Sequence, residues 1–149
     1  MKKFLFISGF VFLAGLTTVF AGEPKKMNES PVRSFSRDFS GASVISWQRE
    51  GDYSKVTFTM NNQVMYAFYS VETSELVGVA RNILSDRLPI LLMASLKNDF
   101  DGYWITNLVE VVRNGETAYY ATLENEGKVI QVKSAGFNGW SIENKIKKN

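Results

Sequence analysis

The feature that most constrains the fold of this chain is a series of short segments in which apolar and polar residues alternate. In Tyr53–Met60, Val56 and Phe58 face one way while polar side chains face the other. A period of two is typical of a strand with one packed and one solvated face. Asn114-Gly115 is typical of a tight hairpin between two such strands. The other predicted strands are Ser43–Arg49, Val64–Tyr69, Leu76–Ile83, Trp104–Arg113, Thr117–Leu123 and Lys128–Ser134.

Two segments have helical periodicity instead. The first begins at Ser30-Pro31, a capping hydroxyl followed by a residue suited to the first helical turn, and ends at Gly41. The second opens in Leu84–Pro89 and ends at Gly102. Their apolar stripes are Val32, Phe35 and Phe39 in the first, and Leu88, Leu92, Leu96 and Phe100, with Leu91 beside them, in the second. We interpret both stripes as faces that pack on the core.

The order of elements is therefore helix, four strands, helix, and three or four strands. The two halves resemble each other, since Phe39-Ser40-Gly41 corresponds to Phe100-Asp101-Gly102. This order predicts the α+β class: an antiparallel sheet with helices packed on one face, built as two helix-plus-meander halves. Within it, Ile45 and Trp47 share a strand face, and we expect Trp47 to be buried.

The N-terminus has the three-part pattern of a secretory signal peptide. Lys2 and Lys3 precede the apolar run Phe4–Leu16, which is too short to span a membrane, and Ala21 is the expected cleavage position. We therefore expect a periplasmic or secreted protein with no transmembrane segment in its mature chain. The predicted organisation is a signal peptide (1–21), a flexible leader (22–29), one domain (30–141) and a Lys-rich tail (142–149) that frays from Ile142.

Composition excludes several classes of function. The chain has no His and no Cys, which removes Ser-His-Asp hydrolases, Cys proteases, haem proteins and zinc enzymes. Removing Lys2 and Lys3 with the signal peptide leaves 15 basic and 15 acidic residues, so the mature chain has no net charge. A neutral surface argues against nucleic acid and anionic lipid as partners.

An ordered set of residues between positions 30 and 139 is familiar. It comprises Phe35, Phe39, Ala42-x-Val44-x-x-Trp47, Tyr53-x-x-Val56-x-Phe58, Ala67-x-Tyr69, Leu88-Pro89, Phe100, Ile105 and Tyr119-Tyr120-x-x-Leu123. The set resembles the PepSY-like family, small exported proteins of Bacteroidota also described as beta-lactamase-inhibitor-like. The chain departs from it in Ser40, where the family usually has Pro, and in Ser70–Glu75, which lacks the usual Asp-Gly turn.

The resemblance implies a fold related to the PepSY domain and to the beta-lactamase inhibitor protein. Relatives in this wider group occur in protease propeptides and act as inhibitors or binding modules. The matching residues here are mostly core positions, so the resemblance implies a fold and assigns no site residue.

Side chains suited to catalysis are scarce. The sequence has no Ser-x-x-Lys, no Gly-x-Ser-x-Gly and no Gly-rich phosphate loop. Asp99-Phe100-Asp101-Gly102 offers too few oxygens for a calcium loop. The close carboxylate pairs, all at turns or element ends, are Asp99/Asp101, Glu72/Glu75 and Glu124/Glu126. We therefore expect a protein that is not an enzyme, and that needs no cofactor and no metal.

Large aromatic residues near turns are the better candidates for a binding site. They are Tyr53, Trp104, Phe137 and Trp140. Such residues either anchor a protein partner or close the ends of the core. The solvated sheet face offers Lys55, Thr57 and Thr59, with Gln131 and Lys133 on a later strand. This polar face either surrounds a docked partner or is plain solvent-facing sheet.

Two hypotheses follow for the function. The first is an exported, non-catalytic binding module, an inhibitor or regulator of another exported or envelope protein. The second is a small-ligand carrier or a carboxylate-based enzyme. In the second case the sheet curls around a pocket lined by Tyr66, Phe68, Trp104 and Tyr120.

Overall fold

A computed structural model describes residues 29–134, 137 and 139–148, and within them the chain forms one eight-stranded antiparallel sheet in the order β1 to β8. The strands are β1 (Ser43–Glu50), β2 (Tyr53–Met60), β3 (Gln63–Ser70), β4 (Leu76–Asn82), β5 (Trp104–Arg113), β6 (Glu116–Glu124), β7 (Lys128–Ser134) and β8 (Trp140–Lys147). The helices are α1 (Glu29–Asp38), the short 3-10 helix η1 (Ser85–Arg87) and α2 (Ile90–Asp99). This confirms the predicted α+β class. The predicted signal peptide and residues 22–28 of the leader lie outside the described residues.

Both α-helices pack on the same face of the sheet, as strand register shows. Residues paired across neighbouring strands share a face. The row that crosses from β1 to β6 on the α1 side is Trp47, Val56, Ala67, Val79, Val112 and Thr117. Ala121 lies four residues beyond Thr117 on β6, so it points to the same side, and it packs with Leu92 of α2.

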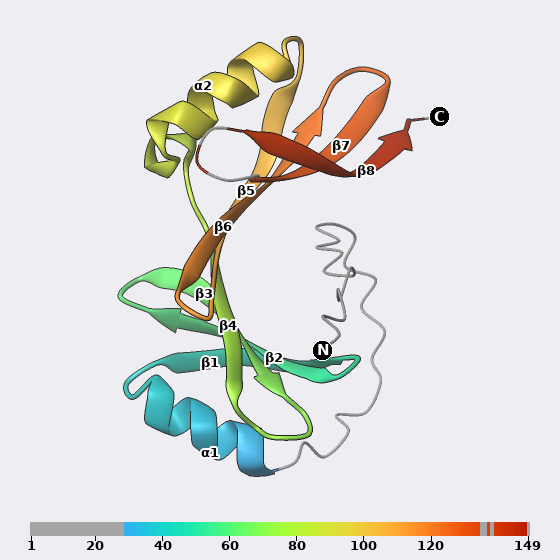
Figure 1. Cartoon of the computed structure of the whole chain (residues 1–149). Helices are drawn as coiled ribbons and strands as arrows, with labels where there is room; N and C mark the ends of the chain where they lie inside the picture. The colour runs from blue at the N-terminus through green and yellow to red at the C-terminus, as the bar shows by residue number, and fades with distance from the viewer. Residues whose placement is uncertain (1–28, 135–136, 138, 149) are drawn as a thin grey trace, which may run out of the picture.

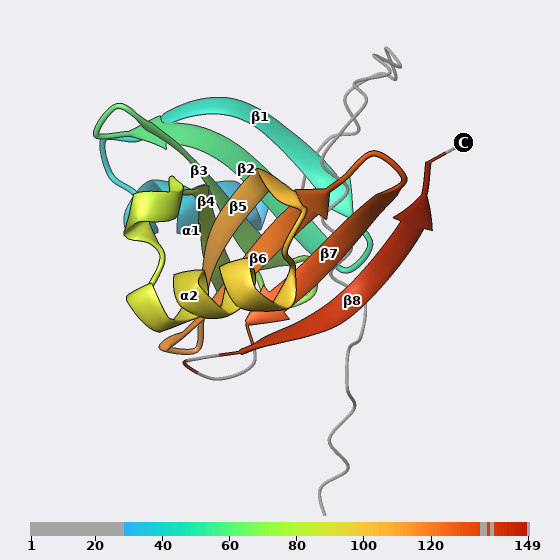
Figure 2. The same ribbon diagram turned by 90° about the horizontal axis from the view of Figure 1, so that it is seen from above.

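The sheet is strongly bent, and the helices lie outside the bend. α1 lies against the strands of the first half, and α2 lies against those of the second half (Figure 1). Seen from above, α2 crosses in front of the second half, while β1 and β8 form opposite edges of the sheet (Figure 2). We call the helix-covered side the outer face and the helix-free, concave side the inner face.

Aromatic rings fill the space beneath α1. Phe35 is 3% exposed, and its ring centroid lies 5.0 Å from that of Phe58 and 5.4 Å from that of Phe39. The rings of Trp47 and Tyr69 complete the cluster at 5.7 and 6.5 Å from Phe35. Offset and edge-on ring pairs at such distances add to the stabilisation from burial. Phe35 and Phe39 of the α1 stripe thus face the core, as predicted, whereas Val32 is 39% exposed.

Leucines fill the corresponding space beneath α2. Leu88, Leu92 and Leu96 are buried against β5, β6 and β7, as the predicted stripe requires. Phe100, the last residue of that stripe, is half-buried. Leu91, predicted to lie beside the stripe, is instead 58% exposed on the outer side of the helix.

Three further predictions need correction. The segment from Ile142, expected to fray, forms most of β8, which pairs with β7 and continues in a bond from the Lys148 N–H to the Gly127 carbonyl (2.9 Å). Ile45 does not share the face of Trp47, because a bulge between Val44 and Ser46 leaves it 58% exposed. Trp47 is half-buried at the edge of the α1 cluster rather than fully buried.

Candidate functional site

The inner face gathers the polar residues that the sequence placed on one side of β2. Tyr53, Lys55, Thr57 and Thr59 alternate with the buried residues that face α1, so all four lie on the inner face. Each is half-buried rather than fully exposed. The prediction that Lys55, Thr57 and Thr59 share one face of the strand is confirmed, and Tyr53 lies on the same face. Their function as a docking surface is a separate matter.

The centre of the inner face is a packed apolar strip formed by Phe68, Ala80 and Val109. These residues are 2%, 1% and 1% exposed. Tyr66 packs against the strip from β3, and Tyr120 packs against it from β6. Strands β3 to β6 are therefore packed on both faces, and the inner face is apolar in the middle.

A lysine ammonium group lies over the ring of each of these two tyrosines. The Lys55 ammonium lies 5.4 Å from the centroid of the Tyr66 ring, and the Lys133 ammonium lies 5.7 Å from that of Tyr120. A cation over an aromatic ring at such distances is attracted by the ring's electrons. Lys55 also forms an ion pair with Glu50 at 3.1 Å. The apolar strip thus has a tyrosine–lysine pair on either side.

Trp104 borders the inner face at the far end of β5. It pairs with Glu124, which alternates with the buried Leu123 and so points to the inner side. Trp104 is 51% exposed, and the Lys148 ammonium lies 5.5 Å from its ring centroid and 2.9 Å from the Glu124 carboxylate. The hydrogen bond from Lys148 lowers the pKa of Glu124.

Trp140 does not join this surface. Trp140 packs with the α2 cluster on the outer face, and its indole N–H donates to the Leu92 carbonyl at 3.0 Å. It therefore closes the end of the core, which was the second of its two interpretations, and we leave it out of the docking surface. Phe137 is 88% exposed, but its neighbours 135, 136 and 138 lie outside the described residues.

Within the described part of the chain, the four side chains predicted to line a ligand pocket do not gather around one. Phe68 is packed in the apolar strip with Tyr66 and Tyr120 beside it, and Trp104 lies away at the end of β5. A hollow of about 30 Å³ beside Tyr120 has room for a water molecule. A larger pocket lies on the outer face beneath α2, lined in part by Met93, Phe100 and Ile105. Sequence reasoning missed it.

Two polar clusters on the outer face were also missed. Arg81 and Glu110 are register partners across β4 and β5 and form an ion pair at 2.5 Å. Burial, and then the neighbouring Glu110, raise the pKa of Tyr119. In the first half, the Tyr69 hydroxyl donates to the Asp38 carboxylate at 3.2 Å and ties the end of α1 to the sheet. These clusters hold elements together.

Acidic residues are dispersed across the described structure. Within the described ranges, no group of three or more His, Cys, Asp or Glu side chains is placed to hold a metal ion. Asp99 accepts a hydrogen bond from the Ser95 hydroxyl at 2.8 Å, which engages it at the end of α2. Among the helices that the structure describes, none has the length and apolar character needed to cross a membrane.

Similar folds occur among solved structures, although no family model and no curated protein matches the sequence. A protein from Bacteroides eggerthii, provisionally described as periplasmic, has a TM-score of 0.71 and 12% identity, covering 83% of this chain and 90% of its own. A DUF2874 family protein from Bacteroides uniformis has a TM-score of 0.70 and 11% identity, with coverages of 80% and 88%. A BLIP-like protein from Bacteroides fragilis has a TM-score of 0.69 and 12% identity, covering 84% of this chain and 90% of its own.

These likenesses establish the fold, which this chain shares with a BLIP-like protein. At 11 to 12% identity they do not carry a function across. Membership of the PepSY-like family stays a prediction.

Proposed function

We propose that this chain is an exported, non-catalytic binding module that docks a protein partner on its inner face. The observation that supports this most is the arrangement of Tyr66–Lys55 and Tyr120–Lys133 on either side of the Phe68 strip. Tyrosines are frequent anchors of protein interfaces, because they offer a large rigid surface with a polar tip. Half-buried side chains of this kind also lose less conformational freedom when a partner covers them.

The partner that fits this proposal is another exported or envelope protein, which the module inhibits or regulates. Structural neighbours described as BLIP-like and, provisionally, as periplasmic support it, as does the resemblance to a group that includes inhibitors. The balanced charge of the mature chain favours binding through buried anchors over long-range steering. Export itself rests on the signal-peptide pattern of residues 1–21.

Two members of the predicted carboxylate pairs are engaged by other side chains, which supports a non-catalytic function. Glu124, one member of a predicted carboxylate pair, is held by Lys148, and Asp99 of another pair is held by Ser95. A general acid or base needs a pKa close to the working pH, and the lowered pKa of Glu124 moves it away from that range.

Photo-crosslinking in the producing cell tests the docking face. A photoreactive amino acid in place of Thr57 lies on the inner face, and the same amino acid in place of Asn98 lies on the exposed side of α2. We expect the first variant to crosslink one discrete envelope protein that the second does not. Crosslinking from Asn98 alone would place the partner on the outer face instead.

Alanine at Trp104 then measures the energy of the contact. Because Trp104 is 51% exposed, we expect Trp104→Ala to weaken binding of the captured protein by about 2 kcal/mol or more, as at interface anchors, with the fold intact. Leu91→Ala, which removes an exposed apolar side chain of α2 on the outer face, is the control and should leave binding unchanged. Equal affinity for the two variants would exclude Trp104 from the interface.

A further inference from the structure

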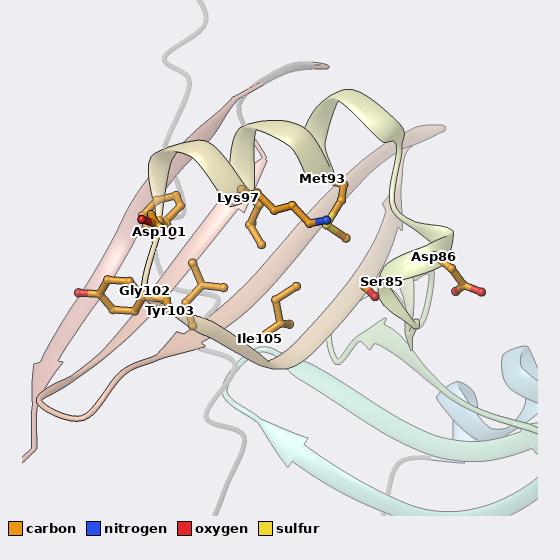
Figure 3. A pocket seen from close by; sticks show the side chains of 11 residues that line it. Ser85, Asp86, Met93, Lys97, Asp101, Gly102, Tyr103 and Ile105 are labelled. Atoms are coloured by element: carbon orange, nitrogen blue, oxygen red, sulfur yellow. The ribbon is translucent and has the colours of Figure 1, made fainter.

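A pocket of about 670 Å³ lies on the outer face, between α2 and the strands beneath it. Figure 3 shows it opening between the helix and the start of β5, with the η1 turn at one end and Tyr103 at the other. Pockets of roughly 300–1,000 Å³ are typical of sites for small molecules. The proposed protein-docking face lies on the opposite side of the sheet, so this pocket is independent of it.

Apolar side chains form the body of the pocket. Leu96 and Leu123, which are 5% and 1% exposed, belong to the α2 cluster and form part of the wall of the pocket. Met93 points into the space from the helix, and Ile105 points up from β5 (Figure 3). Phe100 lines the pocket near the end of the helix. Such a lining favours a ligand with a hydrocarbon body, because burying apolar surface is the main favourable contribution to binding.

One basic side chain, that of Lys97, lies at the mouth of the pocket. Lys97 extends along it from α2, and its ammonium group is directed toward the end where the Ser85 side chain lies (Figure 3). Among the residues that the structure describes, Lys97 forms no ion pair. The ammonium group is suited to bind a carboxylate, because a charge-assisted hydrogen bond is stronger than a neutral one.

Two acidic residues also border the pocket, and their placement sets where an anion fits. The Asp86 carboxylate points away from the space, while Asp101 lies at the opposite end, beside Gly102 (Figure 3). An anionic head is therefore disfavoured near Asp101 and favoured near Lys97. A bound ligand is therefore oriented with its anionic head at the Ser85 end and its hydrocarbon body toward Phe100.

We propose that the pocket beneath α2 binds a small monocarboxylic acid with a hydrocarbon body, such as a medium-chain fatty acid. The hydrocarbon lies against Leu96, Ile105 and Leu123, and the carboxylate lies at Lys97. The pocket thus adds a ligand-binding site to a protein whose partner-binding site is on the inner face. Either site can exist without the other.

Titration of the purified protein with decanoate and, separately, with decanol tests this inference. We expect decanoate to bind saturably in calorimetry and to shift amide resonances of Met93, Ile105 and their neighbours rather than those of the inner face. Lys97→Met should weaken decanoate binding by about tenfold or more, because it removes one charge-assisted hydrogen bond, and should leave decanol binding unchanged. Lys97→Arg should retain most of the affinity for decanoate.

Lys128→Met is the matched control, because Lys128 is an exposed lysine at the β6–β7 turn and does not line the pocket. It should bind decanoate as the unaltered protein does. The inference is overturned if decanoate does not bind saturably, or if its resonance shifts lie on the inner face. It is also overturned if Lys97→Met and Lys128→Met lose affinity equally.

Discussion

The α1 half and the α2 half cover one face of a single sheet with helices of 10 residues each, but they fill the space beneath those helices differently. Under α1, Phe35 contacts the rings of Phe39 and Phe58, and Tyr69 ties the sheet to the end of the helix. Under α2, leucines occupy the centre, and a pocket of about 670 Å³ remains beside Leu96.

The difference shows how one architecture accommodates both a rigid support and a binding pocket. Aromatic rings are large and stiff, so a few of them close the gap between a helix and a sheet. Leucines bury comparable apolar surface per atom but leave irregular space beside the helix, as at Leu96. We infer that the α1 half contributes more stability per residue and that the α2 half tolerates substitution of its core residues better.

Truncating Phe35 should have the largest effect. Because Phe35 is 3% exposed at the centre of four ring contacts, we expect Phe35→Ala to lower the free energy of unfolding by about 3–5 kcal/mol. Urea denaturation followed by circular dichroism measures it. A loss below about 1 kcal/mol, which is typical of surface positions, would contradict the rigid character of the α1 half.

Truncating Leu96 should cost less, although it is buried to a similar degree at 5% exposure. Leu96 already lines the pocket, so Leu96→Ala enlarges an open space rather than creating a closed cavity. We expect a loss of about 2 kcal/mol, the low end for a core leucine. Leu92→Ala, a change away from the pocket, is the control in the same assay and should cost more. The reverse order would remove the distinction between the two sites.

Replacing Trp140 by Phe tests how β8 is attached to the α2 half. The change keeps an aromatic ring but removes the indole N–H that donates to the Leu92 carbonyl at 3.0 Å. We expect a loss of about 1 kcal/mol in thermal or urea unfolding, the usual net contribution of one hydrogen bond. If stability is unchanged while partner binding is lost, Trp140 is an anchor after all.

The α1 half should also respond to alkaline pH. Burial raises the pKa of the Tyr69 phenol, and the neighbouring Asp38 raises it further. Folding thus favours the neutral phenol, so its contribution to stability is complete below about pH 10, the ordinary pKa of tyrosine, and is lost as the pH rises through the folded value. In urea denaturation at increasing pH, Tyr69→Phe should lose stability less steeply than the unaltered protein. Equal slopes in the two proteins would contradict the stabilisation of the neutral Tyr69 phenol by folding.

The smallest effect is expected at the end of the α2 half, where Lys148 holds Glu124. Removing the ammonium group in Lys148→Met should raise the pKa of Glu124 toward its ordinary value, because the bond that lowers it is lost. The carboxyl resonance of Glu124, followed by NMR during acid titration, measures this. Lys147→Met, the neighbouring change, should leave the titration as it is. An unaltered titration in Lys148→Met would mean that the C-terminus is not held against β6.

The strands that face the helices could be predicted from the sequence, because the alternation of apolar and polar residues follows burial directly. In β2, Val56 and Phe58 alternate with Lys55 and Thr57, and the structure places them on opposite faces. β8 had no such pattern, since it is held mainly by its pairing with β7 and remains exposed along most of its length. Ile45 was misassigned because a single bulge reverses the alternation.

The candidate sites could be predicted from the sequence only in part, since they depend on contacts between distant segments. Trp104 and Trp140 both stand at strand ends, and nothing local distinguishes the exposed one from the one that bonds to α2. The pairing of Lys133 with Tyr120 depends on the register between β6 and β7, and the pocket depends on how α2 is seated. Composition and spacing identify such residues as candidates, and tertiary packing decides between them.

The order of the strands has a consequence for how the protein reaches this structure. Each strand pairs with the strand next to it in sequence, from β1 to β8, with no crossover between them. Contacts between segments close in sequence have a small loop-closure cost and favour rapid folding for a sheet of this size. The chain can therefore add hairpins one after another as it emerges, and the first half can collapse around Phe35 before β5 is available.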